Sequence, residues 1–354
     1  MRLLKYKKND NINFQFLISN IVWISNYERL QNLSTNINQH LSLNKMITIL
    51  GPTATGKTRL AANVAAKLNG EVISADSRQV YKGMDLGTGK DYDDYIVDGN
   101  KIPYFLIDIV DPGYEYNVYE YQRDFLEIYK NIISRQKLPV LCGGTGLYIE
   151  AILKAYKLVK VPENKSLREK LEKKKTGELI KMLSSFRALH NVTDSKDRER
   201  LIRAIEIQNY YKEKPDLISD YPKIKNEIFG IYFDRNIIRK RITERLKARL
   251  ESGMLDEVKN LLSKGITPEQ LKFYGLEYKY ITQYIIGELN YNDMFQKLNT
   301  AIQQFAKRQM TWFRKMERNG FKIHWINGEL PNTKKISEIL YFINKTCINK
   351  FNCL

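Results

Sequence analysis

The chain has 354 residues with 43% hydrophobic side chains, which suits one large α/β domain with an insertion, or two domains. Its formal net charge of +18 favours a polyanionic partner such as nucleic acid, with a general bias of composition toward Lys as the alternative explanation. Three cysteines at unrelated spacings and three scattered histidines argue against a disulfide framework and a zinc site, and we expect a cytoplasmic protein.

Residues 1–45 precede the first expected core strand and hold six Lys and Arg against two Asp and Glu. The apolar stretch 14–24 is only about half of a membrane span, so we expect no transmembrane helix and no membrane partner. We expect this segment to be a disordered extension or a mis-assigned start, without a catalytic role.

The first predicted strand, 46–50, leads into Gly51-Pro52-Thr53-Ala54-Thr55-Gly56-Lys57-Thr58, and a helix is expected over 59–69. The octapeptide fits the phosphate-loop pattern G-x-x-x-x-G-K-[ST] at every fixed position. In this pattern backbone N–H groups turn toward a phosphate, and the helix N-terminus adds positive potential. We therefore expect a diphosphate or triphosphate here, with Lys57 at its outer phosphate and the Thr58 hydroxyl as a Mg²⁺ ligand.

Further strands are expected over 71–75, 105–110, 139–142 and 227–233, with helices over 118–135 and after residue 146. Strands that alternate with helices predict an α/β fold, a parallel sheet flanked by helices. Ligands of such sheets bind at the carboxyl ends of the strands. Asp76 and Thr145 each follow a predicted strand, so both should lie near the phosphate loop.

Residues 159–222 interrupt this pattern with highly charged, helix-periodic sequence, which predicts an inserted helical subdomain. The core would then comprise residues 46–158 and 223–354, the second part ending in helices.

The helix expected after residue 233 carries Arg241 and Arg245 one turn apart, so both could face one anion, or could belong to a solvated basic face. A final short strand is expected over 321–326. A basic stripe formed by Lys307, Arg308, Arg314, Lys315 and Arg318 is expected opposite Ile302, Phe305 and Phe313.

Several segments together closely resemble the tRNA dimethylallyltransferase family, over about residues 46–327. They are 51–58, Ile73-Ser74-Ala75-Asp76-Ser77-Arg78-Gln79-Val80-Tyr81 with its continuation to Thr88, 108–112, Gly143-Gly144-Thr145-Gly146-Leu147-Tyr148, 200–206 and 306–313. The stretch 76–88 is more specific than the phosphate loop, because generic nucleotide kinases do not share it. Gly275-Leu276-Glu277 departs from the usual Gly-Tyr-Arg or Gly-Tyr-Lys, which we expect to affect only a local tRNA contact.

The resemblance implies transfer of a dimethylallyl group from dimethylallyl diphosphate to N6 of adenosine 37, next to the anticodon, in tRNAs that read codons starting with U. It also implies Mg²⁺, the anticodon stem-loop of tRNA as partner, an insertion that grips this stem-loop, and a monomer. On this reading the diphosphate binds residues 51–58, Arg241 and Arg245, with Arg245 the stronger choice by analogy.

The expected chemistry needs positive charge around the leaving diphosphate and a base for the amino group. Lys57 and Arg245 would supply charge. Asp76 would accept the proton of N6, or alternatively cap backbone groups or support Mg²⁺ through water. Thr145 would hold the adenine or a phosphate oxygen, or serve only in a turn.

An adenosine inside the anticodon loop must leave its stack to react. Beside Asp76 and Thr145, we expect Ser77, Arg78 and Gln79 to read base edges. Arg168, Arg200 and Arg203 would contact the RNA backbone. Each of these residues could instead be an ordinary solvated side chain.

Two other functions remain open at this point. An ATP-dependent small-molecule or nucleotide kinase would explain the loop, Mg²⁺ and the arginines, but not the stretch 76–88 or the positive charge. The other is a nucleic-acid-stimulated ATPase, or an RNA-binding module with an inactive loop. The ATPase would need a hydrophobic run ending in Asp-Glu to activate water, and the sequence has no clear one.

Overall fold

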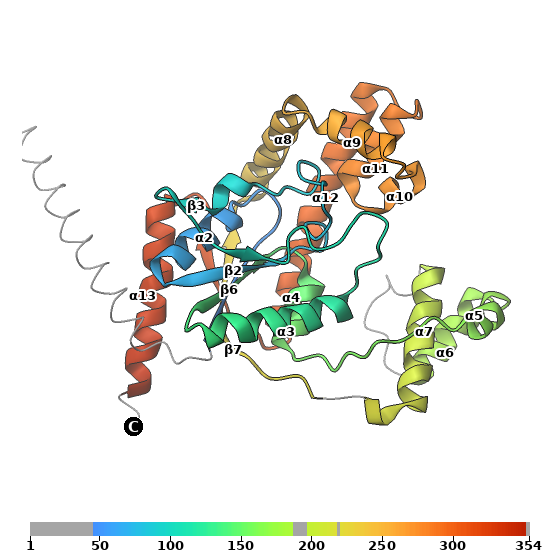
Figure 1. Cartoon of the computed structure of the whole chain (residues 1–354), viewed down its shortest axis with the longest axis horizontal. Coiled ribbons are helices and arrows are strands. Elements are labelled where there is room, and N and C mark those ends of the chain that lie inside the picture. The colour runs from blue at the N-terminus through green and yellow to red at the C-terminus, as the bar shows by residue number, and fades with distance from the viewer. Residues whose placement is uncertain (1–44, 187–196, 218–219, 352–354) are drawn as a thin grey trace, which may run out of the picture.

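The computed structural model describes residues 45–186, 197–217 and 220–351 (Figure 1). The expectation for residues 1–45 falls outside these ranges, apart from Lys45. Within them, six parallel strands form the main sheet in the order β5-β2-β6-β1-β7-β8. Their bounds are β1 Lys45–Leu50, β2 Gly70–Ala75, β5 Tyr104–Phe105, β6 Leu138–Gly143, β7 Lys225–Tyr232 and β8 Ile323–Asn327. The predicted α/β fold is confirmed.

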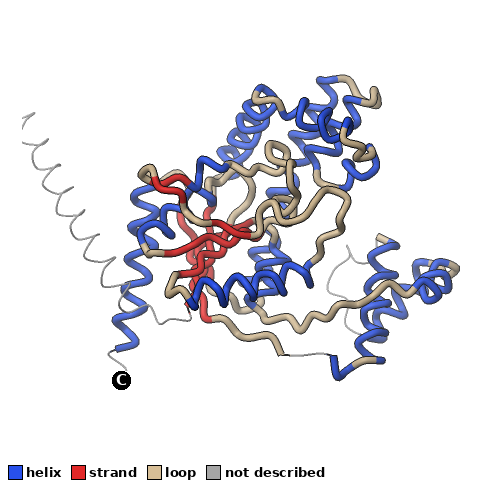
Figure 2. Tube along the Cα trace, in the orientation of Figure 1, coloured by secondary structure: helices blue, strands red, loops and turns tan. Residues whose placement is uncertain are grey.

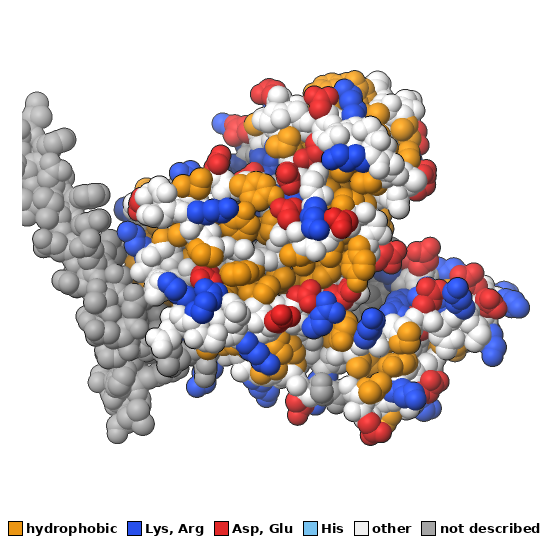
Figure 3. All heavy atoms as spheres, in the orientation of Figure 1, with side chains coloured by type: hydrophobic (Ala, Val, Ile, Leu, Met, Phe, Trp, Pro, Cys, Tyr) orange, Lys and Arg blue, Asp and Glu red, His pale blue; other side chains and the backbone are white. Residues whose placement is uncertain are grey.

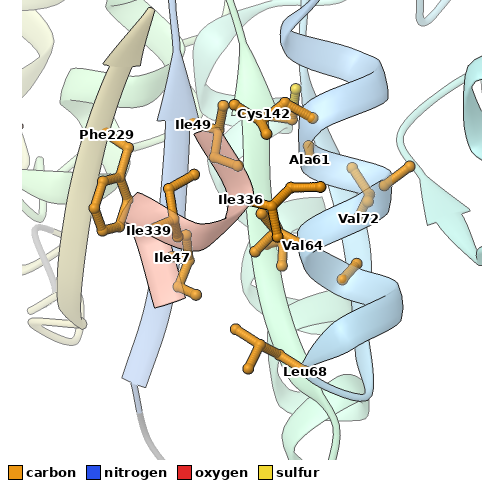
Figure 4. Packing of buried hydrophobic residues seen from close by; sticks show 14 of the residues in the cluster. Ile47, Ile49, Ala61, Val64, Leu68, Val72, Cys142, Phe229, Ile336 and Ile339 are labelled. Carbon is orange, nitrogen blue, oxygen red and sulfur yellow. The ribbon is translucent and has the colours of Figure 1, made fainter. Parts of the chain in front are cut away.

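Helices cover both faces of the sheet, because the central strands alternate apolar side chains between two layers. On one face, Ile47 and Ile49 of β1 pack against α2 (Lys57–Lys67) and α13 (Asn332–Phe351), as Figure 4 shows. On the other face, Met46 and Leu50 belong to a cluster with α3 (Val118–Ser134), α4 (Gly146–Leu153) and the last turns of α12 (Tyr291–Arg318). The sheet is therefore buried on both sides, and its carboxyl edge is left as the place for a site.

A second group of helices, the helical cap, stands above that edge (Figure 2). It consists of α8 (Arg235–Glu251), α9 (Met254–Ser263), α10 (Pro268–Phe273), α11 (Leu276–Ile285) and the first half of α12. Its apolar core includes Val80, Tyr81 and Met84, which follow β2. The residues after Asp76 are thus packed into the cap. Between them and β5 lie the short elements η1 (Tyr92–Tyr95), β3 (Ile96–Val97) and β4 (Asn100–Lys101).

A third group of helices lies to one side of the sheet in Figure 1. These are α5 (Lys165–Glu172), α6 (Thr176–Phe186), α7 (Arg198–Glu213) and the short η2 (Pro215–Leu217). They share an apolar cluster of their own, which includes Leu171, Leu179 and Leu201. We call α5–α7 with η2 the helical insertion.

The expected strand at 105–110 is wrong in extent. Of this range only Phe105 belongs to the sheet, in β5, because Leu106 and Asp108 have φ angles of 62° and 56° and turn the chain away. Phe305 also differs from the prediction, because 39% of it is exposed while Phe313 is buried. None of the helices in the described part of the chain combines the length and the apolar composition that a bilayer crossing needs.

Candidate active site

The phosphate loop leaves the carboxyl end of β1 between β6 and β7. Two of its residues, Ala54 and Gly56, have left-handed φ angles of 62° and 75°, and the Thr55 hydroxyl donates to Pro52 O at 2.9 Å. Successive backbone N–H groups in such a turn point to one side and form an anion-binding concavity. A left-handed alanine is costly, so the surrounding fold must hold it in place.

A cavity of about 410 Å³ opens at this concavity. Lys57 and Thr58 from the start of α2 line it together with Arg241 and Arg245 from α8. Both arginines also hold the loop: Arg241 Nε donates to Ala54 O at 2.9 Å, and Arg245 Nη1 donates to Thr53 Oγ1 at 3.2 Å. The structure therefore gathers four groups that suit an anion at one place.

The positive charge of Lys57 is destabilised in this cavity. Burial lowers the pKa of Lys57 below its ordinary value of 10.5, and the positive charge of Arg245 adds to that effect. The negative charge of Asp76 acts in the opposite direction. A diphosphate bound in the cavity would stabilise the charged form of Lys57, because it supplies negative charge beside it.

Asp91 is a further member of the site that the sequence did not reveal. Its carboxylate accepts from Arg245 Nη2 at 2.6 Å and from Arg249 Nη2 at 3.0 Å. Burial alone would raise the pKa of Asp91, but the two arginines outweigh it and the pKa lies below its ordinary value. Asp91 and the α8 arginines are about 150 residues apart in the chain, so only the fold brings them together.

Glu277 lines a second, small cavity beside the loop, together with Thr53, Arg245 and Arg249. Burial raises the pKa of its carboxyl group, against the pull of Arg249. The departure at Gly275-Leu276-Glu277 therefore lies beside the arginines of the anion cavity, where we had expected only a local tRNA contact.

Asp76 lies in the turn after β2, beside Thr145 at the start of α4. Asp76 Oδ1 accepts from Arg78 N at 2.9 Å, and Thr145 Oγ1 accepts from Ser77 N at 3.0 Å. The backbone N–H of Thr145 also donates to Ala75 O at 3.1 Å. Asp76 thus caps the turn with one oxygen, and its Oδ2 has no hydrogen-bond partner within the described ranges.

Gln309 of α12 connects these two halves of the site, and the sequence reasoning missed it. Its Oε1 accepts from Thr53 N at 2.9 Å, and its Nε2 donates to Gly144 O at 3.0 Å. Gln309 is only 7% exposed. One buried amide therefore fixes the phosphate loop at a set distance from the Gly143–Thr145 segment that supports Asp76. Gln309 lies within the segment 306–313, which carries part of the family resemblance, and this position could have pointed to it.

The residues after Asp76 form a tightly bonded loop. The Gln79 amide accepts from Ser74 Oγ at 3.0 Å and donates to Gly89 O at 3.0 Å, so it holds the loop itself. The Glu257 carboxylate accepts from the backbone N–H groups of residues 85–87 and ties the loop to α9. The Arg78 guanidinium instead lies over the Phe273 ring, 5.6 Å from its centroid. The buried Lys90 ammonium donates to Tyr81 O and pairs with Asp85 and Asp108, which holds the loop together.

The three arginines of the helical insertion differ in their surroundings. Arg168 Nη2 donates to the buried Glu206 carboxylate at 2.9 Å, and Arg203 pairs with the same carboxylate and donates to Val161 O at 2.8 Å. Arg200 is largely exposed and pairs with Asp197 at 3.0 Å. The first two hold the insertion together, and Arg200 is the most accessible of the three.

Sheet, loop and cavity together define a phosphate-loop α/β protein. A family model described as IPP transferase matches residues 79–316, and one described as isopentenyl transferase matches residues 44–109. "tRNA dimethylallyltransferase 2" of Bacteroides fragilis is 58% identical over 292 residues, which is 82% of this chain and 95% of that protein. "tRNA dimethylallyltransferase 1" of Geotalea uraniireducens is 53% identical over 83% of this chain and 96% of that protein. The chain belongs to the IPP transferase family and is a prenyl-transferring enzyme.

Solved structures agree with this assignment. The tRNA isopentenylpyrophosphate transferase of Bacillus halodurans matches 88% of this chain and 99% of that chain, with a TM-score of 0.64 and 32% identity. A eukaryotic dimethylallyltransferase acting on tRNA has a TM-score of 0.65 at 23% identity, over 80% of this chain and 74% of that one, and supports the fold alone.

Proposed function

We propose that this enzyme transfers the dimethylallyl group of dimethylallyl diphosphate to N6 of adenosine 37 in tRNAs that read codons starting with U, and releases diphosphate. One observation carries the proposal: Asp76 and Thr145 follow β2 and β6 at the edge where the phosphate loop follows β1, and Gln309 joins the two sides. A donor held in the loop would therefore face an acceptor held beside Asp76. The names of the curated relatives support tRNA as the acceptor.

The reaction follows from the charges on the two sides. The N6 nitrogen attacks the allylic C1 carbon, and the bond from C1 to the diphosphate oxygen breaks. The bonding electrons leave with the diphosphate, whose growing negative charge is stabilised by Lys57, Arg245 and the backbone N–H groups of the loop. The free Oδ2 of Asp76 accepts one N6 proton as the new C–N bond forms. Thr145 acts by holding Ser77, and with it the Asp76 turn, in place.

The residues present suit Mg²⁺ beside the diphosphate. The Thr58 hydroxyl lines the anion cavity at the start of α2 and would be its protein ligand. Within the described ranges, no cluster of three or more His, Cys, Asp or Glu side chains could hold a metal ion. This pattern fits an ion that takes most of its ligands from diphosphate oxygens and water. When bound, Mg²⁺ would neutralise part of the diphosphate charge.

The proposed tRNA partner accounts for the net charge of +18 and for the helical insertion that stands apart from the sheet. We infer that the insertion grips the anticodon stem-loop, with Arg200 on the RNA backbone. Ser77 and Arg78 would contact the extruded base or its neighbours. A monomer in the cytoplasm would suffice, because one chain supplies every group named above.

Transfer of label tests the proposal. The protein is incubated with unmodified tRNA that reads a U-starting codon, Mg²⁺ and radiolabelled dimethylallyl diphosphate, and in parallel with ATP. We expect label in the tRNA at position 37, located by nuclease mapping, and no ATP consumption. ATP turnover without labelled RNA would instead support a kinase.

The variant Asp76→Asn keeps the shape of the side chain and removes its basic oxygen. We expect transfer to fall at least 100-fold while the Kd for tRNA changes little. Asp98→Asn is the control, because Asp98 is exposed and its left-handed φ of 50° suits Asn as well. An equal loss of tRNA affinity in Asp76→Asn would assign Asp76 to binding instead.

A further inference from the structure

Three large apolar side chains are exposed on segments that adjoin the Asp76 turn. Phe273 is 60% exposed, Leu147 40% and Ile109 36%. Leu147 is two residues past Thr145, which holds Ser77, and Ile109 N donates to Val80 O at 2.9 Å. Phe273 lies under the Arg78 guanidinium. Each of these segments next to the Asp76 turn therefore presents one large apolar side chain to solvent.

Phe273 is the most exposed of the three and the only aromatic one. It is the last residue of α10, and its ring stands edge-on to Tyr274 at 6.0 Å between centroids. Tyr274 is buried and packs edge-on against Tyr81 at 4.7 Å. The ring of Phe273 is thus tied through its neighbours to the loop after Asp76, although its own surface faces solvent.

The pairing with Arg78 points to one kind of ligand. A guanidinium over an aromatic ring keeps its positive charge, which can bind an RNA phosphate. The planar groups can in addition stack on an unpaired base. An exposed aromatic ring can stack on any nucleobase, because every nucleobase has a π face. Position matters too: Arg78 is two residues from the group proposed to accept the N6 proton.

Figure 3 shows the molecule hollowed between the helical cap and the helical insertion, and α10 borders this hollow on the cap side. A stem-loop that reaches from the insertion to Asp76 would cross it. The bases next to the extruded adenosine would then lose their stacking partner at the point where Phe273 is exposed.

We propose that Phe273 is a stacking platform for an unpaired nucleobase adjacent to the target adenosine, with Arg78 on the flanking phosphate. This inference rests on the proposed tRNA substrate and adds the residue that replaces the stacking lost when the adenosine leaves the loop. Because Phe273 does not touch the reacting atoms, it contributes to RNA affinity and leaves the affinity for the prenyl donor unchanged.

RNA binding tests the proposal without requiring catalysis. The Kd of a fluorescent anticodon stem-loop RNA is measured by anisotropy for the full chain and for Phe273→Ala, Phe273→Leu and Phe273→Trp. We expect Ala and Leu to weaken binding about tenfold and Trp to restore it, because stacking needs an aromatic face. Tyr341→Ala is the matched control, since Tyr341 is 64% exposed but lies on α13, which packs on the sheet beside α2 and not in the helical cap.

Two further RNAs, one with an abasic nucleotide on the 5′ side of the target adenosine and one with it on the 3′ side, identify the partner base. On one of the two RNAs, Phe273→Ala and the wild type should bind equally, because the stacking partner is gone. Binding of Phe273→Ala equal to the wild type on intact RNA, or full rescue by Leu, would overturn the platform. Failure of the labelling experiment with intact RNA affinity would overturn the proposed function and leave the platform standing.

Discussion

At the scale of single residues, the depressed pKa of Lys57 gives the enzyme a pH dependence that an ordinary lysine would not. Burial is the main cause, and the pKa lies below 10.5. As pH rises through the lowered pKa, Lys57 loses its proton and its attraction for diphosphate. We therefore expect affinity for inorganic diphosphate to fall in the alkaline range before an ordinary lysine would titrate, with proton uptake on binding, measured by calorimetry at several pH values.

The variant Lys57→Arg separates this effect from the titration of diphosphate itself. Arginine stays charged throughout the range, so the ratio of the two affinities reports only the Lys57 proton. A ratio that stays constant up to about pH 10 would contradict the lowered pKa.

Asp91 offers a second test at this scale. Asp91→Asn keeps the size of the side chain but removes the carboxylate that pairs with Arg245 and Arg249, so Arg245 loses its ion pair with Asp91 and keeps its hydrogen bond to Thr53. Half-exposed ion pairs contribute about 1 kcal/mol, and we expect the KM for the prenyl donor to rise about fivefold with a smaller change in kcat. Asp93→Asn is the control, because Asp93 is exposed in the same segment and has no ion pair among the described residues. A lower KM in Asp91→Asn would mean that Asp91 competes with the donor.

The structure places the predicted loop residues, Asp76 and Thr145 at one edge of the sheet, and their chemical roles stay predictions. The loop residues, Asp76 and Thr145 lie in short segments whose order and spacing are visible without a fold. Asp91 and Gln309 act through contacts with segments about 150 to 250 residues away, and no local pattern carries that information. Gln79 shows the reverse case: its place beside Asp76 suggested base reading, whereas its amide is bonded to Ser74 and Gly89.

At the scale of elements, α12 sets the spacing between the two halves of the site through Gln309. In Gln309→Glu, a carboxylate oxygen can still accept from Thr53 N but cannot donate to Gly144 O, and the two oxygens repel. We expect kcat to fall about 10- to 100-fold, because small misplacements of reacting groups are costly, while diphosphate affinity changes little. Single-turnover transfer and calorimetry measure the two quantities.

Gln303→Glu is the control on the same helix. Gln303 Oε1 accepts from Arg239 Nε at 2.8 Å on the exposed side, and glutamate preserves that bond. Equal losses of kcat and diphosphate affinity in Gln309→Glu would indicate general damage to the loop rather than a change of spacing.

Strands and helices were predicted correctly where the periodicity of the hydrophobic residues and the length of the segment were both clear. The strands around β1, β2, β6 and β7 and the helix α3 agree with the expected ranges within about two residues, because buried parallel strands are continuous apolar runs. The segment 105–110 has the same composition but is pulled away from the sheet. Val110 O accepts from Lys82 N, and Asp108 and Ile109 bond to the backbone of Gln79 and Val80. Tertiary contacts override local preference there.

At the scale of the whole molecule, the core and the helical insertion have separate apolar clusters, so we expect them to unfold separately. Glu206 is the centre of the insertion: its side chain is 1% exposed and accepts from Arg168, Arg203 and the backbone N–H of Asn164. Removing one partner of a buried ionic network costs about 3 kcal/mol, which is most of the stability that a small helical unit can have.

We therefore expect Glu206→Ala to unfold α5–α7 while the sheet stays intact. Amide hydrogen exchange should rise in these helices and remain slow in β1 and β6, the Kd for tRNA should rise at least tenfold, and diphosphate affinity should not change. Glu213→Ala is the control, since Glu213 is exposed at the end of α7. Unchanged tRNA affinity with an unfolded insertion would separate the insertion from RNA binding, whereas loss of protection in β1 would mean that the two clusters fold as one unit.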